Sequence, residues 1–470
     1  MTESNRAIII GAGPAGLTAA YELIKSGYEV IVVEKDKQVG GISKTINYKG
    51  YLFDLGGHRF FTKYPEVKKI WEEVLPGDFF LRPRLSRIYY KGKFFYYPLR
   101  PFNAFWNLGP LISAQAFISY LKARIRPYRQ PVNFEQWVIN QFGRKLYEIF
   151  FKTYTEKIWG IPCTEISADW AAQRIKGLSL GKAMLNAFGL KGKETVRTLI
   201  DRFHYPRRGP GQFWDKMAEI IVRRGGKLIL EAEAIEIIIQ ADGGFRVKLR
   251  TEDRVEEISA GVIISSMPLS ELIQWLRPHP PEEVLKAARR LSYRDFYTAG
   301  LVINKEKILP DNWIYIHSIE IQAGRLQNFK NWSPEMVPDP KKTMLGLEYF
   351  CFFTDPIWSL PDKELIQIAI DDLEKLKFAR KEEVLDGSIV RIPKAYPVYL
   401  PGYQKNVSAI KEFLETIKNL QTIGRNGLHR YNNQDHSMLS GILAAKCVLG
   451  ENCSPWQVNF EDEYHEIAQR

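Results

Sequence analysis

The chain has 470 residues; 45% of them are hydrophobic, 26% are charged, and the formal net charge is +12. A chain of this length exceeds the size at which one hydrophobic core stops growing, so we expect at least two lobes. No apolar run reaches the length of a membrane span, and the first residues lack the regions of a signal peptide, which predicts a cytoplasmic protein. Four cysteines without a C-x-x-C pair or a His–Cys cluster predict buried thiols, with no disulfide and no metal site.

The positive charge points to an anionic partner. Basic residues are scattered, and no zinc, helix-turn-helix or RNP signature accompanies them, so we do not expect nucleic acid as the partner. An anionic small molecule explains the charge equally well. Residues 111–125 have helical apolar spacing and run into Lys122, Arg124 and Arg126, which suits a helix lying on an anionic membrane. A core-facing helix would show the same spacing, so peripheral membrane contact stays open, and the oligomeric state is not indicated.

The first motif in the chain is AIIIGAGPAG at residues 7–16. Its apolar start predicts a buried parallel strand, and helical spacing follows it. Gly11, Gly13 and Gly16 then form a G-x-G-x-x-G turn, which allows a tight bend, close approach to a pyrophosphate, and close packing of helix on strand. A second predicted strand ends at Glu34, where an acidic residue can accept hydrogen bonds from ribose hydroxyls. These features together predict a dinucleotide site.

The next segment, VGGISKTINYKGYLFDLGGHRFF, supplies two more loops. Gly41 and Ser43 lie in a loop whose backbone and hydroxyl can reach a second part of the dinucleotide. Residues 45–53 are predicted to form a hairpin that turns at a Lys–Gly pair. Gly57 belongs to a glycine pair that lets the chain pass close to a flat ring, and His58 follows it directly. A histidine here is as consistent with a structural role as with a functional one.

Residues 66–204 change character and are predicted to form a mainly helical insertion, with one hairpin at 87–98. The stretch FFKTYTEKIWGIPCTEISADWAAQR is dense in aromatic residues. Aromatic side chains at helical spacing usually belong to a core. Tyr154, Trp159 and Arg174 could instead stack on, or pair with, a base, sugar or phosphate.

The remaining chain alternates between two regions. Strands at residues 205–270 return to the dinucleotide domain, and residues 271–384 form a second excursion of strands and one amphipathic helix. Residues 385–450 return again and end in a strand, a polar loop and a helix from about Ser437. We therefore predict a discontinuous cofactor domain (1–65, 205–270 and 385–450), the helical insertion, a substrate-covering sheet (271–384) and a C-terminal tail (451–470).

Three motifs, GAGPAGLTAAYEL, GGISKT and DLGGH, together resemble the FAD-binding signature of the glutathione-reductase-like flavoproteins. Within that group they are similar to the branch of amine oxidases, protoporphyrinogen oxidases and UDP-galactopyranose mutases. The resemblance implies an α/β fold: a glutathione-reductase-like FAD-binding Rossmann domain with an inserted helical region and a sheet-based substrate region. It implies FAD at the interface of the lobes, with NAD(P)H as a candidate reductant.

Over its whole length to about residue 450, the chain resembles the eukaryotic-type UDP-galactopyranose mutases. DLGGHRFF, EKIWGIP, GRLQNFKNWSPE and GRNGLHRYNNQDHSM occur in the same order. The resemblance implies catalytic roles for His58, Arg174 and Arg325. The implied substrate-binding residues are Tyr97, Phe150, Trp159, Arg174, Arg325, Tyr396 and Tyr431. The implied cofactor-binding residues are Gly11, Gly13, Gly16, Glu34, Gly41, Ser43, Gly57, Gly424, Arg425, Asn433, Gln434 and Asp435.

The reaction that the resemblance implies is redox-neutral. The N5 atom of reduced flavin attacks the anomeric carbon of a nucleotide diphosphate sugar, which is interconverted between pyranose and furanose forms. Arginines and tyrosines are suitable ligands for a diphosphate, because guanidinium groups give paired, charge-assisted hydrogen bonds. Arg100 and Thr155 stand where the family has a glutamine and an asparagine, so the nucleobase stays open.

Two other classes of function remain. A FAD-dependent oxidase or desaturase of the protoporphyrinogen oxidase or amine oxidase type would transfer hydride to oxidised FAD. A non-catalytic carrier, similar to the GDP-dissociation inhibitors, would use the same fold without chemistry. The intact glycine turn and Glu34 argue against the carrier, since a carrier does not need a pyrophosphate site.

Overall fold

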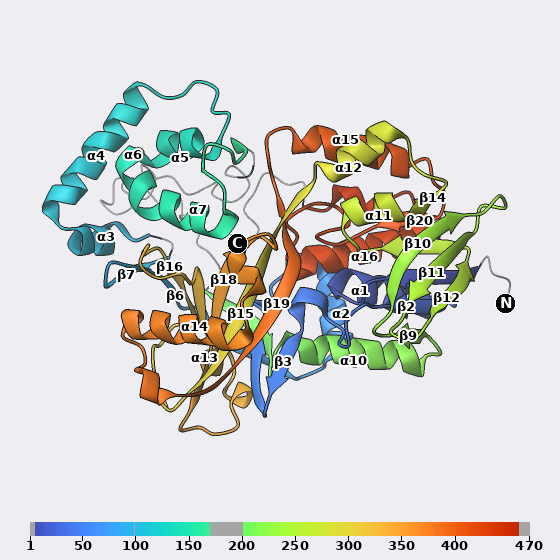
Figure 1. The fold of residues 1–470 in the computed structure, drawn as a ribbon, viewed down its shortest axis with the longest axis horizontal. Coiled ribbons are helices and arrows are strands. Elements are labelled where there is room, and N and C mark those ends of the chain that lie inside the picture. The colour runs from blue at the N-terminus through green and yellow to red at the C-terminus, as the bar shows by residue number, and fades with distance from the viewer. Residues whose placement is uncertain (1–4, 98, 169, 171–200, 460–470) are drawn as a thin grey trace.

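The computed structural model describes residues 5–97, 99–168, 170 and 201–459. Figure 1 shows two lobes: the one on the right contains the first strand, and the one on the left contains long strands with a group of helices above them. The expected α/β architecture is confirmed. The chain crosses between the lobes several times, so both are built from segments far apart in the sequence.

A five-stranded parallel sheet forms the centre of the right-hand lobe. Its order is β20 (Leu420–Thr422), β13 (Val262–Ser265), β1 (Arg6–Ile10), β2 (Glu29–Val33) and β9 (Lys227–Ile229). Ile9 pairs with Ile264 on one side and with Val32 on the other, and all three side chains are fully buried. Runs of branched apolar residues are typical of a parallel sheet that is covered on both faces.

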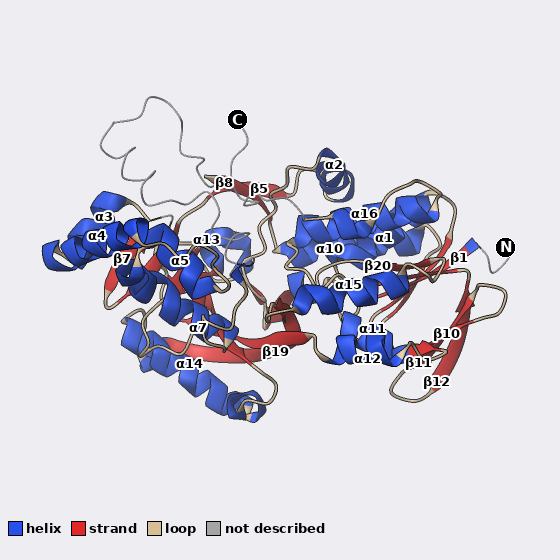
Figure 2. Cartoon of the chain, turned by 90° about the horizontal axis from the view of Figure 1, so that it is seen from above, coloured by secondary structure: helices blue, strands red, loops and turns tan. Residues whose placement is uncertain are grey.

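Two layers cover this sheet, as Figure 2 shows from above. The first layer consists of α1 (Pro14–Lys25), α2 (Pro65–Val74), α10 (Pro210–Arg223) and α16 (Gln434–Val448). The second contains a separate four-stranded sheet, in the order β12 (Val255–Ala260), β11 (Phe245–Arg250), β10 (Glu233–Ile239) and β14 (Leu276–Arg277). It also contains α11 (Leu269–Trp275), α12 (Glu282–Arg289) and α15 (Tyr403–Leu414). Helix α2 lies in the predicted helical insertion but packs here through Val67, Ile70 and Trp71, because these form its buried face.

A seven-stranded sheet, called here the substrate sheet, forms the centre of the left-hand lobe. Its order is β19 (Val384–Val398), β15 (Ser292–Ile303), β18 (Thr343–Cys351), β17 (Arg325–Asn328), β16 (Trp313–Ile316), β6 (Ser86–Tyr90) and β7 (Lys93–Tyr96). All neighbours are antiparallel except β16 and β6. The sequence placed β6 and β7 in the helical insertion and β19 in the cofactor domain. Their long-range pairing puts them in this sheet instead.

Helices cover both faces of the substrate sheet. Helix α14 (Asp362–Leu376) packs on one face, as its amphipathic sequence predicts. The other face meets an aromatic core beneath α3 (Pro101–Leu108), α4 (Pro110–Ile125), α5 (Phe134–Phe142), α6 (Arg144–Leu146) and α7 (Thr153–Trp159). The two predicted hairpins are confirmed: β3 (Thr45–Tyr48) with β4 (Tyr51–Asp54), and β6 with β7. Lys49 and Lys91, which begin their turns, have positive φ, and each precedes a glycine.

Within the described ranges, no helix has the length and apolar character that crossing a bilayer would require. In the same part of the chain, no three His, Cys, Asp or Glu side chains gather as a metal site would need. Cys163 and Cys351 are buried free thiols, as predicted, whereas Cys447 and Cys453 are half-buried.

Candidate cofactor and substrate site

The glycine-rich turn joins β1 directly to α1. Gly11 has a φ of +99°, and a Cβ there would lie 2.2 Å from the Ser266 hydroxyl oxygen. A Cβ on Gly16 would lie 1.9 Å from the carbonyl oxygen of Gly11, so only glycine lets the helix approach the strand this closely. A Cβ on Gly13 would meet only the Cα of Gly41, at 3.8 Å. Internal packing therefore does not require glycine at position 13, but its half-buried backbone leaves room for a phosphate.

Glu34 follows β2 and lies against this turn. Its Oε2 accepts a hydrogen bond from the Ala12 amide at 2.7 Å, and its Oε1 accepts one from the Asp36 amide at 2.9 Å. The same place is reached by the short 3-10 turn Gly41–Ser43, whose Ser43 is buried. Residues from β1, β2 and this turn thus surround one helix N-terminus, whose positive end favours phosphate.

The DLGGH loop lies between the two lobes. Gly57 is exposed although its neighbour Gly56 is buried, so the backbone is open at this point. A Cβ on Gly56 would lie 3.6 Å from His58 Cε1 and 3.9 Å from both carboxylate oxygens of Glu348. A Cβ on Gly57 would lie 3.4 Å from the side-chain nitrogen of Gln327. The loop therefore touches the substrate sheet, and it brings His58 beside that sheet.

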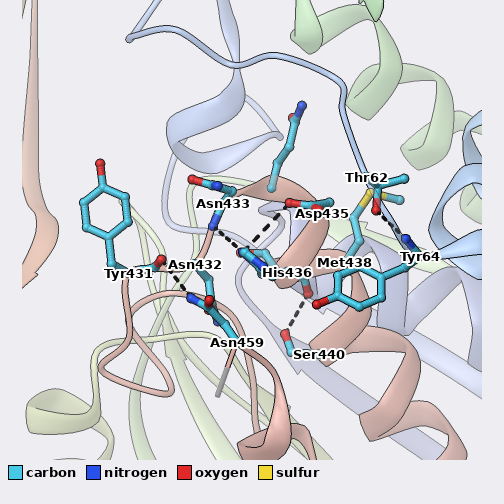
Figure 3. Close-up of polar contacts among 12 residues, drawn as sticks. Thr62, Tyr64, Tyr431, Asn432, Asn433, Asp435, His436, Met438, Ser440 and Asn459 are labelled. Carbon is cyan, nitrogen blue, oxygen red and sulfur yellow. Dashed lines mark hydrogen bonds and ion pairs between the residues drawn. The ribbon is translucent and has the colours of Figure 1, made fainter. Parts of the chain in front are cut away.

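The start of α16 forms another part of the site (Figure 3). The helix begins at Gln434, three residues earlier than the sequence indicated, because Asn433 acts as its N-cap and its amide contacts His436 Nδ1 at 3.3 Å. Asp435 lies in the first turn, where a carboxylate suits the helix dipole. The Gly424 amide donates to the Ser440 hydroxyl at 2.9 Å, which ties the preceding loop to the helix.

Gln434 connects this helix to the DLGGH loop. Its side-chain nitrogen donates to the carbonyl oxygen of Arg59 at 2.7 Å. Its Oε1 is buried and has no hydrogen-bond partner within the described part of the chain. A buried acceptor in this condition is available to a hydrogen-bond donor on a bound group.

Arg325 is held in place by three neighbours. Its Nη1 lies 3.1 Å from Glu348 Oε2, and its Nε donates to the Tyr154 hydroxyl at 3.1 Å. The guanidinium also lies 4.9 Å from the ring centre of Phe350. Gln327 donates to the other oxygen of Glu348 at 2.7 Å. The guanidinium is thus rigidly oriented, and its charge is balanced by one buried carboxylate.

Arg425 forms a second cationic group nearby. Its guanidinium lies over the rings of Tyr396 and Tyr431, at 5.0 and 4.8 Å from their centres. The two tyrosines stack at 5.4 Å. Arg425 also donates to the carbonyl oxygens of Asn432 and Ala395, at 2.9 and 3.2 Å. The structure therefore brings together three residues that were singled out separately in the sequence.

Electrostatics show that His58 and these cations share one environment. Burial, together with the nearby charges of Arg425 and Arg325, lowers the pKa of His58 to about 3. Burial raises the pKa of Tyr396 to about 12. At neutral pH the histidine is therefore neutral and the tyrosine keeps its proton, so Tyr396 can donate a hydrogen bond to an anion.

Two of the other predicted substrate residues, Tyr97 and Trp159, lie around this cluster. Tyr97 packs against Tyr315 at 5.0 Å, and Tyr315 contacts Tyr154 at 5.8 Å. Trp159 is buried at 6.3 Å from Tyr396. Phe150 is only 3% exposed and packs edge-on against Phe95, which places it in the aromatic core with little surface for a ligand. Arg174 lies outside the described residues.

Two residues of the site were not found from the sequence. Glu348 interrupts the otherwise apolar strand segment MLGLEYF, and a carboxylate in such a strand must be paired when it is buried. That irregularity was the available signal. The sequence around Gln327 shows no comparable irregularity, and the role of Gln327 is seen only from its hydrogen bond to Glu348.

The parallel sheet and the glycine turn that follows its central strand β1 define a dinucleotide-binding protein. The chain belongs to the family of flavin containing amine oxidoreductases, whose model matches residues 14–449. It is 22% identical to the chloroplastic protoporphyrinogen oxidase of Nicotiana tabacum, over 94% of this chain and 83% of that protein.

Solved structures share the fold. A reduced UDP-galactopyranose mutase superposes with a TM-score of 0.83 and 24% identity, covering 95% of each chain. The cyclohexylamine oxidase of Brevibacterium oxydans gives a TM-score of 0.67 and 16% identity, covering 95% of this chain and 98% of that one. The family match makes the chain a flavin-dependent enzyme, and the solved structures show that it shares their fold.

The family implies FAD, and the residues present fit it. The half-buried backbone at Gly13 and Gly41 would lie against a pyrophosphate, and Glu34 lies where ribose hydroxyls would donate. The exposed backbone of Gly57 would offer a surface to a flat ring, and the Gln434 acceptor, which has no partner among the described residues, would be available to one of its polar groups.

Proposed function

We propose that this chain is a flavin-dependent mutase, similar to the eukaryotic-type UDP-galactopyranose mutases, that interconverts pyranose and furanose forms of a nucleotide diphosphate sugar. The observation that carries the proposal is the group formed by Arg325, Arg425, Tyr396 and Tyr431 beside a neutral His58. Two guanidinium groups and two phenols next to a single carboxylate match a doubly charged diphosphate.

Each side chain has a role in this proposal. Arg325, oriented by Glu348, binds the diphosphate together with Arg174. Arg425, which the resemblance assigns to the cofactor, lies over Tyr396 and Tyr431, and we therefore assign it to the diphosphate as well. Tyr396 and Tyr431 donate hydrogen bonds to it, which also stabilises the charge of the nucleoside diphosphate as it leaves the sugar. Bound in its reduced form, FAD supplies the nucleophilic nitrogen N5, and NAD(P)H is our candidate for its reduction.

His58 remains neutral in this scheme. Its lowered pKa means that it carries one ring N–H and one acceptor nitrogen at physiological pH. A cationic imidazole beside a reduced, electron-rich ring would stabilise the ring's electrons and so make the ring a weaker nucleophile towards the substrate's carbon. We therefore assign His58 to orientation and hydrogen bonding beside the ring and not to proton donation as an imidazolium.

The tobacco relative favours a second candidate, an oxidase or desaturase of the protoporphyrinogen oxidase type, because it matches 94% of this chain. A cationic site would also accept the carboxylates of such a substrate. It does not suit an amine substrate, since Arg325 and Arg425 would repel an ammonium group.

The test compares two reactions of purified, flavin-loaded protein. Dithionite-reduced enzyme is incubated with UDP-galactofuranose, and the pyranose isomer is sought by chromatography. Oxidised enzyme is the matched control and is expected to give no isomer. Binding of UDP, TDP and GDP sugars to the reduced protein identifies the base. Absence of isomerisation together with oxygen consumption on protoporphyrinogen would support the second candidate instead.

A further inference from the structure

Exposed apolar side chains concentrate on one part of the molecule. Helices α3 and α4 lie at the far left of Figure 1, and the segment after α4 runs along the top of the same lobe towards α5, away from the lobe that holds the parallel sheet. Trp106, Leu111 and Ile125 are 77%, 80% and 77% exposed there. The further large apolar residues exposed in residues 102–132 are Phe102, Phe105, Ile112, Phe117, Ile118, Leu121, Tyr128 and Val132. A patch of this size on an enzyme surface indicates an interaction site.

The apolar face of α4 points away from the protein. Its buried residues include Ala116 and Ala123, seven residues apart, and the helix rests on Gly143, where a Cβ would lie 2.6 Å from the Tyr120 amide nitrogen. Ile118 and Ile125 follow each buried alanine by two residues, which is about 200° around a helix. The small residues thus contact the protein, and the large aliphatic ones face outward, the reverse of an ordinary surface helix.

The charge of this region has one sign. From residue 79 to residue 134 the sequence contains ten Lys and Arg residues and no Asp or Glu. Arg100, Lys122, Arg124, Arg126 and Arg129, which border the apolar patch, are all exposed. Outward aliphatic residues flanked by Lys and Arg, with Trp and Phe among them, are the composition of helices that lie in the interface of an anionic bilayer.

We propose that α3, α4 and residues 126–132 are a docking surface for a membrane of anionic phospholipids. The apolar residues enter the boundary between head groups and acyl chains, and the basic residues contact head-group phosphates. A second copy of the chain fits less well, because it would place two strongly basic surfaces against each other. Single-stranded nucleic acid would stack on the aromatic residues, but its bases would gain no stacking from the outward aliphatic side chains of Leu111, Ile118 and Ile125. This inference does not depend on the substrate proposed above.

The test uses co-sedimentation of the full, flavin-loaded chain with vesicles. One set contains phosphatidylcholine alone, and the other contains phosphatidylcholine with phosphatidylglycerol. The variant Trp106→Ser/Leu111→Ser/Ile125→Ser removes outward side chains only. The matched control, Ile319→Ser/Phe353→Ser, removes apolar residues that are 83% and 66% exposed elsewhere. Arg124→Glu/Arg126→Glu changes the charge. Flavin content and melting temperature are measured for every variant.

Wild type and the matched control should bind the phosphatidylglycerol vesicles, more weakly at raised salt and on phosphatidylcholine alone. The triple serine and the charge variant should each lose at least about tenfold in partition coefficient, with unchanged flavin content. Wild-type protein that stays in the supernatant, or equal losses in the control variant, would overturn the proposal. A wild-type protein that is dimeric in solution and becomes monomeric in the triple variant would also overturn it, since a second copy would then be the partner.

Discussion

Arg325 and Glu348 are directly paired across β17 and β18, and their charged groups approach to 3.1 Å. The Glu348 side chain is completely buried and the Arg325 side chain is 17% exposed. Two charges taken out of water are stable only when each compensates the other. The pairing therefore fixes the direction of Arg325, which reaches the site from the middle of a sheet and not from a mobile loop.

We expect Glu348→Gln to destabilise the fold. Glutamine keeps an acceptor for Gln327, but it leaves the buried charge of Arg325 uncompensated. The free energy of unfolding should fall on the order of 3 kcal/mol, measured by denaturant titration. Glu320→Gln, on the exposed turn after β16, is the control and should change little. Equal stability of both variants would contradict the pairing.

Arg325→Lys should impair turnover without loss of cofactor. Lysine keeps a positive charge beside Glu348 but cannot form a guanidinium fork, so one charge-assisted hydrogen bond to the substrate is lost. We expect KM for the sugar nucleotide to rise, or kcat to fall, by about tenfold or more. Flavin absorbance per protein should stay at the wild-type value. Loss of flavin would mean that Arg325 belongs to the cofactor site.

Gly13→Ala and Gly16→Ala should separate cofactor binding from folding. Alanine at position 13 meets only ordinary contact, 3.8 Å from Gly41, so the apoprotein should fold while the pyrophosphate is excluded. Alanine at position 16 would clash with the Gly11 carbonyl at 1.9 Å and should reduce soluble yield. The measurements are flavin-to-protein ratio and apoprotein melting temperature. A fully flavin-loaded Gly13→Ala protein would refute the assignment of this turn.

His317 should make the protein sensitive to acid. Burial lowers its pKa to about 3, and its ring stacks on Tyr154 at 4.4 Å. Below the ordinary pKa of 6.5, His317 binds a proton in the unfolded chain but stays neutral in the folded chain. The free energy of unfolding therefore decreases as pH falls from about 6.5 towards 3. The slope reaches about 1.4 kcal/mol per pH unit for one group. His317→Phe keeps the stacking and should flatten this slope. The measurement is the free energy of unfolding, by denaturant titration, between about pH 4 and 6.

Asp54 should act in the opposite direction. Burial raises its pKa to about 7, although the hydroxyls of Tyr205 and Thr45 donate to it. Between its ordinary pKa of 3.8 and about 7 the folded chain holds a proton that the unfolded chain has released, so stability falls as pH rises through that window. Asp54→Asn does not titrate and should remove this fall. An unchanged pH slope would show that Asp54 is ionised in the folded protein.

The sequence by itself determined the local features of this protein. The glycine turn with Glu34, the hairpins turning at Lys49 and Lys91, and the amphipathic helix α14 all follow from neighbouring residues. Backbone conformation at a turn and the period of apolar residues are set within a few positions of the chain, so they can be read without knowing the fold. These features also placed the cofactor turn correctly at the junction of β1 and α1.

Only the tertiary structure decided how distant segments meet. The sequence did not indicate that Glu348 pairs with Arg325, that Tyr396 of β19 stacks on Tyr431 of a loop, or that β6 lies beside β16. It left open which way α4 turns its apolar face, since a stripe of apolar residues has the same period whether it meets a core or solvent. Such contacts depend on how whole sheets and helices pack, and that packing is a property of the complete chain.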